Sequence, residues 1–243
     1  MDRICDAGRE NRGFQVSRDQ RPKVSRARRI AGVLLSVVAL AAAYISFPRH
    51  ADLTAFDADA MARLESSMWR DYYEKRYLAL FRDLYDVSRS EYGFSPLDSV
   101  QIAIAAAGAA KAFQPTTSRA EAEAALPSLI AYFRILSEAA KMPIEIEDAA
   151  RTELAWWQAR RERVPTEQYG LIIARVATLL YGIDGEDVRR FGQARAEAMA
   201  YRDARDADIS EADWALIADR LKLAYGLLKK ASIEQALSTP VRQ

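Results

Sequence analysis

The sequence has almost no cysteine or histidine, with one of each among 243 residues. Cys5 precedes the longest apolar run of the chain and His50 lies just after it. The body that follows therefore has no thiol and can form neither an internal disulfide nor a cysteine nucleophile. Without histidine it also excludes a Ser/His/Asp triad and a di-metal site built from Glu-x-x-His motifs. The sequence predicts no metal and no cofactor.

Alternating runs of β-branched residues bounded by hairpin turns are also absent. Apolar residues recur instead at helical spacing, interrupted by proline and glycine, which predicts an all-α protein. We expect an irregular bundle of about seven helices behind one N-terminal transmembrane helix. Pairs of these helices have roughly the length of tetratricopeptide repeats, but no signature recurs at a fixed period.

One run, from Ile30 to Phe47, contains no charged residue. As a helix it covers a little under the roughly 30 Å of a bilayer core, so the run predicts a short transmembrane helix. Arginines at 26, 28 and 29 precede it, whereas only Arg49 follows closely, which favours an N-terminus in the cytoplasm and an extracytoplasmic body at the inner membrane. A cleaved signal peptide and a buried core helix are the alternatives.

The chain divides accordingly into five segments. Nine Lys or Arg and four Asp or Glu make the first 29 residues basic, whereas the rest is mildly acidic with interleaved charges. That balance gives no electrostatic footprint for nucleic acid. We expect a disordered cytoplasmic tail (1–29), the transmembrane helix (30–47), a connector (48–57), a helical domain (58–231) and a flexible tail (232–243).

Capping residues and prolines set the expected helices of the domain. Ser95 precedes Pro96 and Asp98, a pattern typical of a helix N-terminus, and Ser210 with Asp213 has capping-box spacing. Pro127 should kink a helix that starts at Ser118. The expected helices are about 58–91, 96–113, 118–141, 147–162, 165–182, 184–205 and 210–231.

Two helix faces carry an acid at one end, an arginine at the other and aromatic residues between. If these helices pack antiparallel, the first acid meets the second arginine and the reverse, with indole rings between the pairs. The arrangement predicts either a buried ionic seam that fixes helix register or a polar-aromatic pocket for a small ligand or a partner's side chain. The residues are Glu65, Trp69, Tyr72 and Arg76 on the first face, and Glu153, Trp156, Trp157 and Arg160 on the second.

The two glutamates also suggest an enzyme of the cell envelope that uses an acid and a base for glycosidic chemistry. Glu65-Ser66-Ser67 resembles the acid of lytic transglycosylases. However, the glycine- and glutamine-bearing segment expected soon after it is replaced by Trp69-Arg70-Asp71-Tyr72-Tyr73. The sequence does not identify a catalytic residue.

Residues 64–73, Leu-Glu-Ser-Ser-Met-Trp-Arg-Asp-Tyr-Tyr, and residues 149–157, Ala-Ala-Arg-Thr-Glu-Leu-Ala-Trp-Trp, resemble a group of uncharacterised bacterial helical proteins. The resemblance implies a shared fold for most of the body and carries no activity. Together these features predict a single-pass membrane protein whose extracytoplasmic domain is an interaction or scaffold module with a protein partner in the envelope. An envelope enzyme and a small-ligand sensor are the alternatives.

Overall fold

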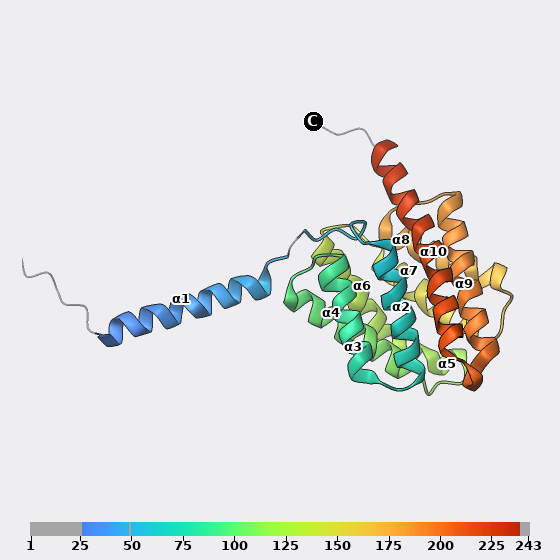
Figure 1. The fold of residues 1–243 in the computed structure, drawn as a ribbon, viewed down its shortest axis with the longest axis horizontal. Coiled ribbons are helices and arrows are strands. Elements are labelled where there is room, and N and C mark those ends of the chain that lie inside the picture. The colour runs from blue at the N-terminus through green and yellow to red at the C-terminus, as the bar shows by residue number, and fades with distance from the viewer. Residues whose placement is uncertain (1–25, 49, 239–243) are drawn as a thin grey trace, which may run out of the picture. The chain divides into compact units, whose positions relative to one another are not determined.

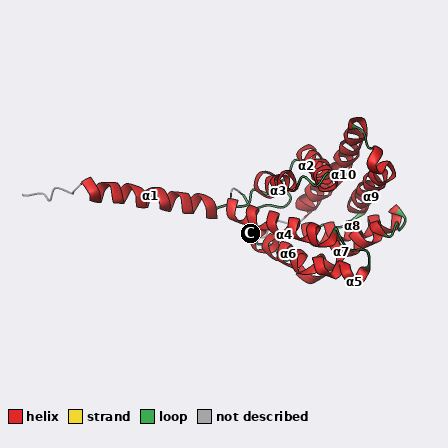
Figure 2. Cartoon of the chain, turned by 90° about the horizontal axis from the view of Figure 1, so that it is seen from below, coloured by secondary structure: helices red, strands yellow, loops and turns green. Residues whose placement is uncertain are grey.

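The computed structural model describes residues 26–48 and 50–238 (Figure 1). Every regular element in this part of the chain is helical, so the all-α prediction is confirmed (Figure 2). The chain divides between Ala41 and Ala42 into two units, which are described separately below. Most of the predicted basic tail and residues 239–243 lie outside the described residues.

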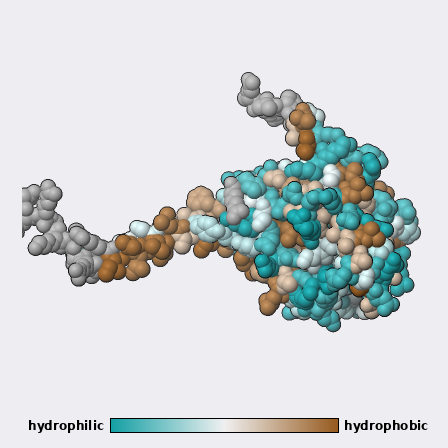
Figure 3. Space-filling view, viewed as in Figure 1, coloured by the Kyte–Doolittle hydropathy of each residue, from teal (hydrophilic) through white to brown (hydrophobic). Residues whose placement is uncertain are grey.

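Helix α1 (Arg26–Ser46) starts four residues before the predicted transmembrane run. Its large apolar side chains are 45–71% exposed, and Figure 3 shows a brown, apolar surface along the helix. They are Ile30, Val33, Leu34, Leu35, Val37, Val38, Leu40 and Ile45. Among residues 26–48 and 50–238, no helix combines the length and apolarity required to cross a membrane.

The body contains α-helices joined by short turns, with a π-helix and two 3₁₀ turns. Their bounds are α2 (Ala58–Tyr73), α3 (Tyr77–Asp86), a π-helix (Val87–Glu91), α4 (Pro96–Phe113), α5 (Arg119–Ala122), a 3₁₀ turn (Glu123–Ala125), α6 (Leu126–Ala140), α7 (Ile146–Arg161), α8 (Thr166–Tyr181), α9 (Glu186–Arg205), a 3₁₀ turn (Asp206–Asp208) and α10 (Glu211–Ser238).

These helices form a closed ring. Each long helix packs against its neighbours in the order α2, α3, α4, α6, α7, α8, α9 and α10, and α10 returns to pack against α2 (Figure 1). The last helix seals the ring with apolar side chains, because Ile217, Leu221 and Leu228 are fully buried. Burial of apolar side chains is the main favourable term in folding. The contact between α2 and α10, the first and last helices of the body, therefore contributes strongly to its stability.

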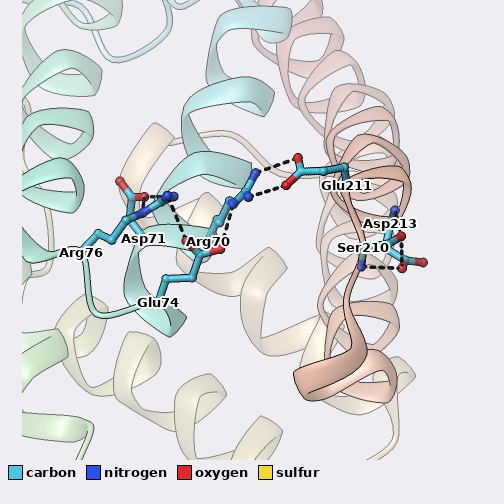
Figure 4. A network of polar contacts seen from close by, with 7 residues as sticks. All are labelled: Arg70, Asp71, Glu74, Arg76, Ser210, Glu211 and Asp213. Carbon is cyan, nitrogen blue, oxygen red and sulfur yellow. Dashed lines mark hydrogen bonds and ion pairs between the residues drawn. The ribbon is translucent and has the colours of Figure 1, made fainter.

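Charged side chains outside the core join α2 to α10, the two helices that close the ring. Arg70 on α2 donates two hydrogen bonds to Glu211 at the start of α10, at 2.9 and 2.5 Å (Figure 4). Near the other end of α2, Lys222 Nζ lies 2.6 Å from Asp59 Oδ2. The two contacts require α2 and α10 to run antiparallel. Their exposure makes each worth little to stability, so they specify register more than they stabilise.

Side-chain caps begin several helices where the sequence predicts them. Ser95 Oγ accepts from the Asp98 amide at 3.1 Å, and Ser210 Oγ accepts from the Asp213 amide at 3.2 Å. Ser118 caps α5 in the same way through the Glu121 amide. Such caps satisfy amides that have no partner within the helix. Asp57 alone caps α2, since Thr54 bonds to Asp52 instead.

Two predicted boundaries are wrong. The expected helix 58–91 breaks after Tyr73, because Lys75 adopts a left-handed conformation (φ 57°) before α3 begins. The expected flexible tail from 232 is helical as far as Ser238, and Ser232 is buried. The sequence has no glycine or proline near Lys75, and its apolar periodicity continues across the break after Tyr73. The pattern therefore predicts one uninterrupted helix there.

Helices α8 and α9 approach closely at two glycines. A Cβ on Gly192 would lie 2.2 Å from the carbonyl oxygen of Gly170 and 2.7 Å from the amide of Ala174. Nearby, Tyr169 Oη donates to the Ala196 carbonyl at 2.7 Å. Only glycine at 192 allows the two backbones to pack at this separation.

Candidate functional site

A cavity of about 300 Å³ lies inside the ring, and we call it the central cavity. Its lining includes residues from α2, α3, α4, α6, α7, α8, α9 and α10, so each long helix of the ring contributes to it. Most of these side chains are aliphatic or aromatic, with a few polar groups among them. The volume suits a small organic molecule better than one or two waters.

Most of the residues singled out in the sequence meet at this cavity. Helix α2 contributes part of one predicted face and α7 contributes the other. The residues that line it are Glu65, Trp69, Tyr72, Glu153, Trp156, Trp157 and Arg160. Arg76 is not among the lining residues, since it belongs to the turn between α2 and α3.

The ion pairs within the predicted set are wrong. Glu65 does not pair with Arg160, and Arg76 does not pair with Glu153. The reason is a third helix: α9 packs between α8 and α10 and supplies Arg195 and Asp203 to the two faces. The prediction considered only two helices and therefore missed both partners.

Glu65 and Arg195 form the most deeply buried ion pair of the cavity. Glu65 is 2% exposed, and its Oε1 accepts from Arg195 Nε at 2.7 Å and lies 2.5 Å from Nη2. Its other oxygen, Oε2, is buried without a hydrogen-bond partner among the described residues. The Arg195 guanidinium also lies 5.0 Å from the centre of the Trp156 ring. Arg195 thus compensates the charge of Glu65 but leaves one acceptor unused.

Glu153 lies on α7, and no arginine of residues 26–48 and 50–238 forms an ion pair with it. Its Oε1 accepts from Trp157 Nε1 at 2.9 Å. Burial raises the pKa of Glu153, while the positive charge of Arg195 opposes this rise and the negative charge of Glu65 adds to it. Glu153 therefore holds a proton more readily than an exposed glutamate does.

Arg160 bonds to neither Glu65 nor Glu153. Its Nε donates to Asp203 Oδ2 at 2.8 Å, and its Nη2 contacts Asp203 Oδ1 and the Tyr73 hydroxyl. The pair joins α7 to α9 at the edge of the cavity. Because Asp203 balances its charge, Arg160 is not a free cation in the site.

Arg76 has a structural role. Its Nε donates to Asp71 Oδ1 at 2.8 Å, and its Nη1 lies 2.9 Å from Glu74 Oε2 (Figure 4). Asp71 is 2% exposed, so Arg76 supplies the positive charge that a buried carboxylate needs. This bond stabilises the turn that breaks the predicted first helix.

Tyrosines form a part of the cavity of which only Tyr72 was predicted from the sequence. Tyr92 and Tyr181 share a hydrogen bond of 2.7 Å between their hydroxyl oxygens. Burial raises the pKa of Tyr181 and of Tyr72 to about 12, and raises those of Tyr132 and Tyr225 as well. These hydroxyls therefore stay neutral at physiological pH. Four of these tyrosines lie on four different helices and Tyr92 follows the π-helix, so they share no local pattern in the sequence.

The arrangement suits binding of a molecule more than metal chemistry. Among the described residues, no group of three His, Cys, Asp or Glu is placed to hold a metal ion. The polar groups that could orient a ligand are Glu65, Glu153 and the indole N–H of Trp156, all held by long helices. Rigid elements position such groups better than loops do.

We compared the chain with known proteins. No protein-family model, no curated protein and no solved structure matches the chain.

Proposed function

We propose that this protein binds a small, mainly apolar molecule in the central cavity and that α1 holds it at a membrane. The observation that carries the first half is the cavity itself, with apolar and aromatic walls and few polar groups. Ligand sites in proteins commonly have this composition. The binding of a small molecule is compatible with the interaction or scaffold role that the sequence predicts, because an occupied cavity can change the surface of the ring.

A glycosidic acid and base are less well supported. Glu65 Oε1 is held by Arg195, so this carboxylate oxygen is already engaged in an ion pair and is poorly placed to reach a substrate. Glu153 does have a pKa raised in the direction that a general acid requires. We therefore infer a binding module and keep catalysis as an outcome that product analysis would reveal.

Filling the cavity should abolish binding. The substitution Ala106→Leu places a larger side chain on the α4 wall of the cavity. We expect the full-length protein in detergent to bind 2-phenylethanol, with a change in tryptophan fluorescence, because three of its four tryptophans line the cavity. Ala106→Leu should remove this saturable signal. Isothermal titration calorimetry gives the affinity.

The control is Ala215→Leu, which adds the same side chain at an exposed position of α10. Ala215→Leu should bind 2-phenylethanol like the unmodified protein. It therefore controls for partitioning of 2-phenylethanol into the detergent. If 2-phenylethanol gives equal signals with both variants, the ligand does not occupy the central cavity and the proposal fails.

The apolar surface of α1 supports the second half of the proposal. Its uncharged part within the helix, residues 30–46, is about 25 Å long, at the short end for a membrane span. Large apolar side chains at this exposure need a covering, and a bilayer covers all sides of a helix at once. No described helix by itself has the length and apolarity of a membrane span, so this half rests on the exposed apolar surface of α1. We propose that α1 inserts into the inner membrane with the N-terminus in the cytoplasm, as the arginines before Ile30 favour.

A charge in the middle of α1 should release the protein from membranes. We expect the unmodified chain to stay in the membrane pellet after washing with alkaline carbonate, and Val38→Arg to move into the soluble fraction, because a central arginine is costly in hydrocarbon. Leu223→Arg, at an exposed position of α10, should remain in the pellet. Carbonate release of the unmodified chain would show that α1 is not inserted.

The orientation has its own readout. Of two reporters fused after Gln243, the one that functions outside the cytoplasm should be active and the one that functions in the cytosol should be inactive. Activity of a reporter that requires the cytosol would contradict the proposed topology and leave the cavity proposal intact.

A further inference from the structure

The central cavity contains more negative charge and more hydrogen-bond acceptors than its own side chains satisfy. Two carboxylates, Glu65 and Glu153, line it, and Arg195 is the arginine that bonds to one of them. Arg160 does not correct this balance, because its bonds go to Asp203 and Tyr73. One carboxylate in the cavity therefore lacks a bonded cation.

The unused acceptor is well defined. Glu65 Oε2 is buried and makes no well-formed hydrogen bond within the described residues, whereas Oε1 accepts from Arg195; the Tyr225 hydroxyl on α10 also acts on this carboxylate. A buried carboxylate oxygen without a donor is costly, so a ligand that supplies an N–H group gains free energy there. Glu65 belongs to α2 and Glu153 to α7, and both line the same space.

One buried donor of the cavity is also without a bonded partner. The indole N–H of Trp156 favours the ionised form of Glu153, but its geometry does not make a hydrogen bond. The Trp156 indole N–H therefore acts on Glu153, and a ligand with its own acidic group is not required to satisfy it. The unbonded polar groups of the cavity are thus one acceptor, Glu65 Oε2, and one donor, the Trp156 indole N–H, and the imbalance that remains is one of charge.

The walls suit a cation that carries an apolar body. Trp69, Trp156 and Trp157 line the cavity together with tyrosines whose hydroxyls are neutral. A positive charge over an aromatic face is attracted by the ring, and most strongly by tryptophan in a desolvated site. Arg195 already lies over Trp156, 5.0 Å from the ring centre, so the cavity contains one such contact.

We propose that the ligand of the central cavity is a small organic amine, whose ammonium group binds Glu65 and Glu153 and whose apolar body lies among the indole rings. The amine supplies the missing positive charge and up to three N–H donors. This inference rests on the proposed function, since it names the chemical class of ligand for the same cavity.

Three molecules of similar size and shape test the inference. The full-length protein is titrated with 2-phenylethylamine, 2-phenylethanol and 3-phenylpropanoate under identical conditions. We expect the amine to bind about tenfold or more tightly than the alcohol, and the carboxylate to bind least, because it adds a third negative charge. Equal affinity of amine and alcohol, or tightest binding of the carboxylate, would overturn the amine assignment but leave the cavity as a ligand site. Binding of none of the three would instead contradict the proposed function.

Substitution of Glu153 locates the preference. Glu153→Gln keeps the shape and the hydrogen bond from Trp157 but removes the charge, so the affinity for the amine should fall about tenfold towards that of the alcohol. Glu147→Gln, an exposed glutamate on the same helix, should leave both affinities unchanged. An unchanged preference for the amine in Glu153→Gln would place the ammonium elsewhere, and circular dichroism confirms that each variant is folded.

The pH dependence gives a second readout. The groups that act on Glu153 are Glu65 on α2, Tyr132 on α6, Tyr181 on α8 and Arg195 on α9. The tyrosines stay neutral and the arginine stays charged. Because burial raises the pKa of Glu153, protonation of this carboxylate as the pH falls should weaken amine binding, whereas alcohol binding should change little. Amine affinity that rises as the pH falls would contradict the assignment.

Discussion

Replacing Arg195 with methionine is expected to lower the free energy of unfolding by about 3–5 kcal/mol, because it leaves the carboxylate of Glu65 buried without its cation. Glu65 is 2% exposed, and Arg195 contacts its Oε1 through both Nε and Nη2. The substitution also removes the guanidinium from the Trp156 ring. Denaturant unfolding of the two proteins under the same conditions measures the difference.

Two further variants separate the ion pair from the general effect of losing an arginine. Arg189→Met, on the same helix, removes an exposed pair with Glu186 and should change stability by less than about 0.5 kcal/mol. The double variant Glu65→Leu/Arg195→Met removes both buried charges and should recover most of the loss. A double variant as unstable as Arg195→Met alone would show that the cost arises from lost packing and not from the uncompensated charge.

The second large effect is expected at the contact between α8 and α9. Gly192→Ala should lower the free energy of unfolding by about 3 kcal/mol, because the added Cβ would lie 2.2 Å from a backbone oxygen that cannot move by itself. The two helices must separate to relieve this overlap, and both line the central cavity. Thermal or chemical denaturation followed by circular dichroism measures the change.

Gly226→Ala is the matched control for that substitution. Gly226 lies on α10 with no atom within 4 Å of an added Cβ, and it is exposed. Alanine has the higher helix propensity, so this variant should be as stable as the unmodified protein or up to about 1 kcal/mol more stable. Similar losses from both substitutions would indicate that the α8–α9 contact is looser than described.

The helices with local signals could be predicted from the sequence. Ser95 with Pro96 places the start of α4, and Gly182 ends α8 in a left-handed conformation, as expected. The break at Lys75 could not be predicted, because it depends on a bond between Arg76 and the buried Asp71, and not on a helix-breaking residue. The closure of α10 on α2 joins the two ends of the body, which no local pattern encodes.

The sequence pointed to part of the candidate site but not to its bonds. Acid and aromatic side chains on one face of α2 and one of α7 drew attention to two of the helices around the cavity, and seven of the eight predicted residues line it. The partners came from α9, whose many charges resemble a solvated surface in the sequence. A distribution of buried charge over three helices is a tertiary property, and helical spacing alone cannot reveal it.

The most direct test of the central claim is a crystal structure of the full chain grown with 2-phenylethylamine. We expect α10 to pack antiparallel on α2, Arg195 to bond Glu65, and the ammonium to lie within hydrogen-bonding distance of Glu65 Oε2 and Glu153. A ring interior filled by side chains, with the amine absent from it, would contradict the claim that this fold encloses a ligand site.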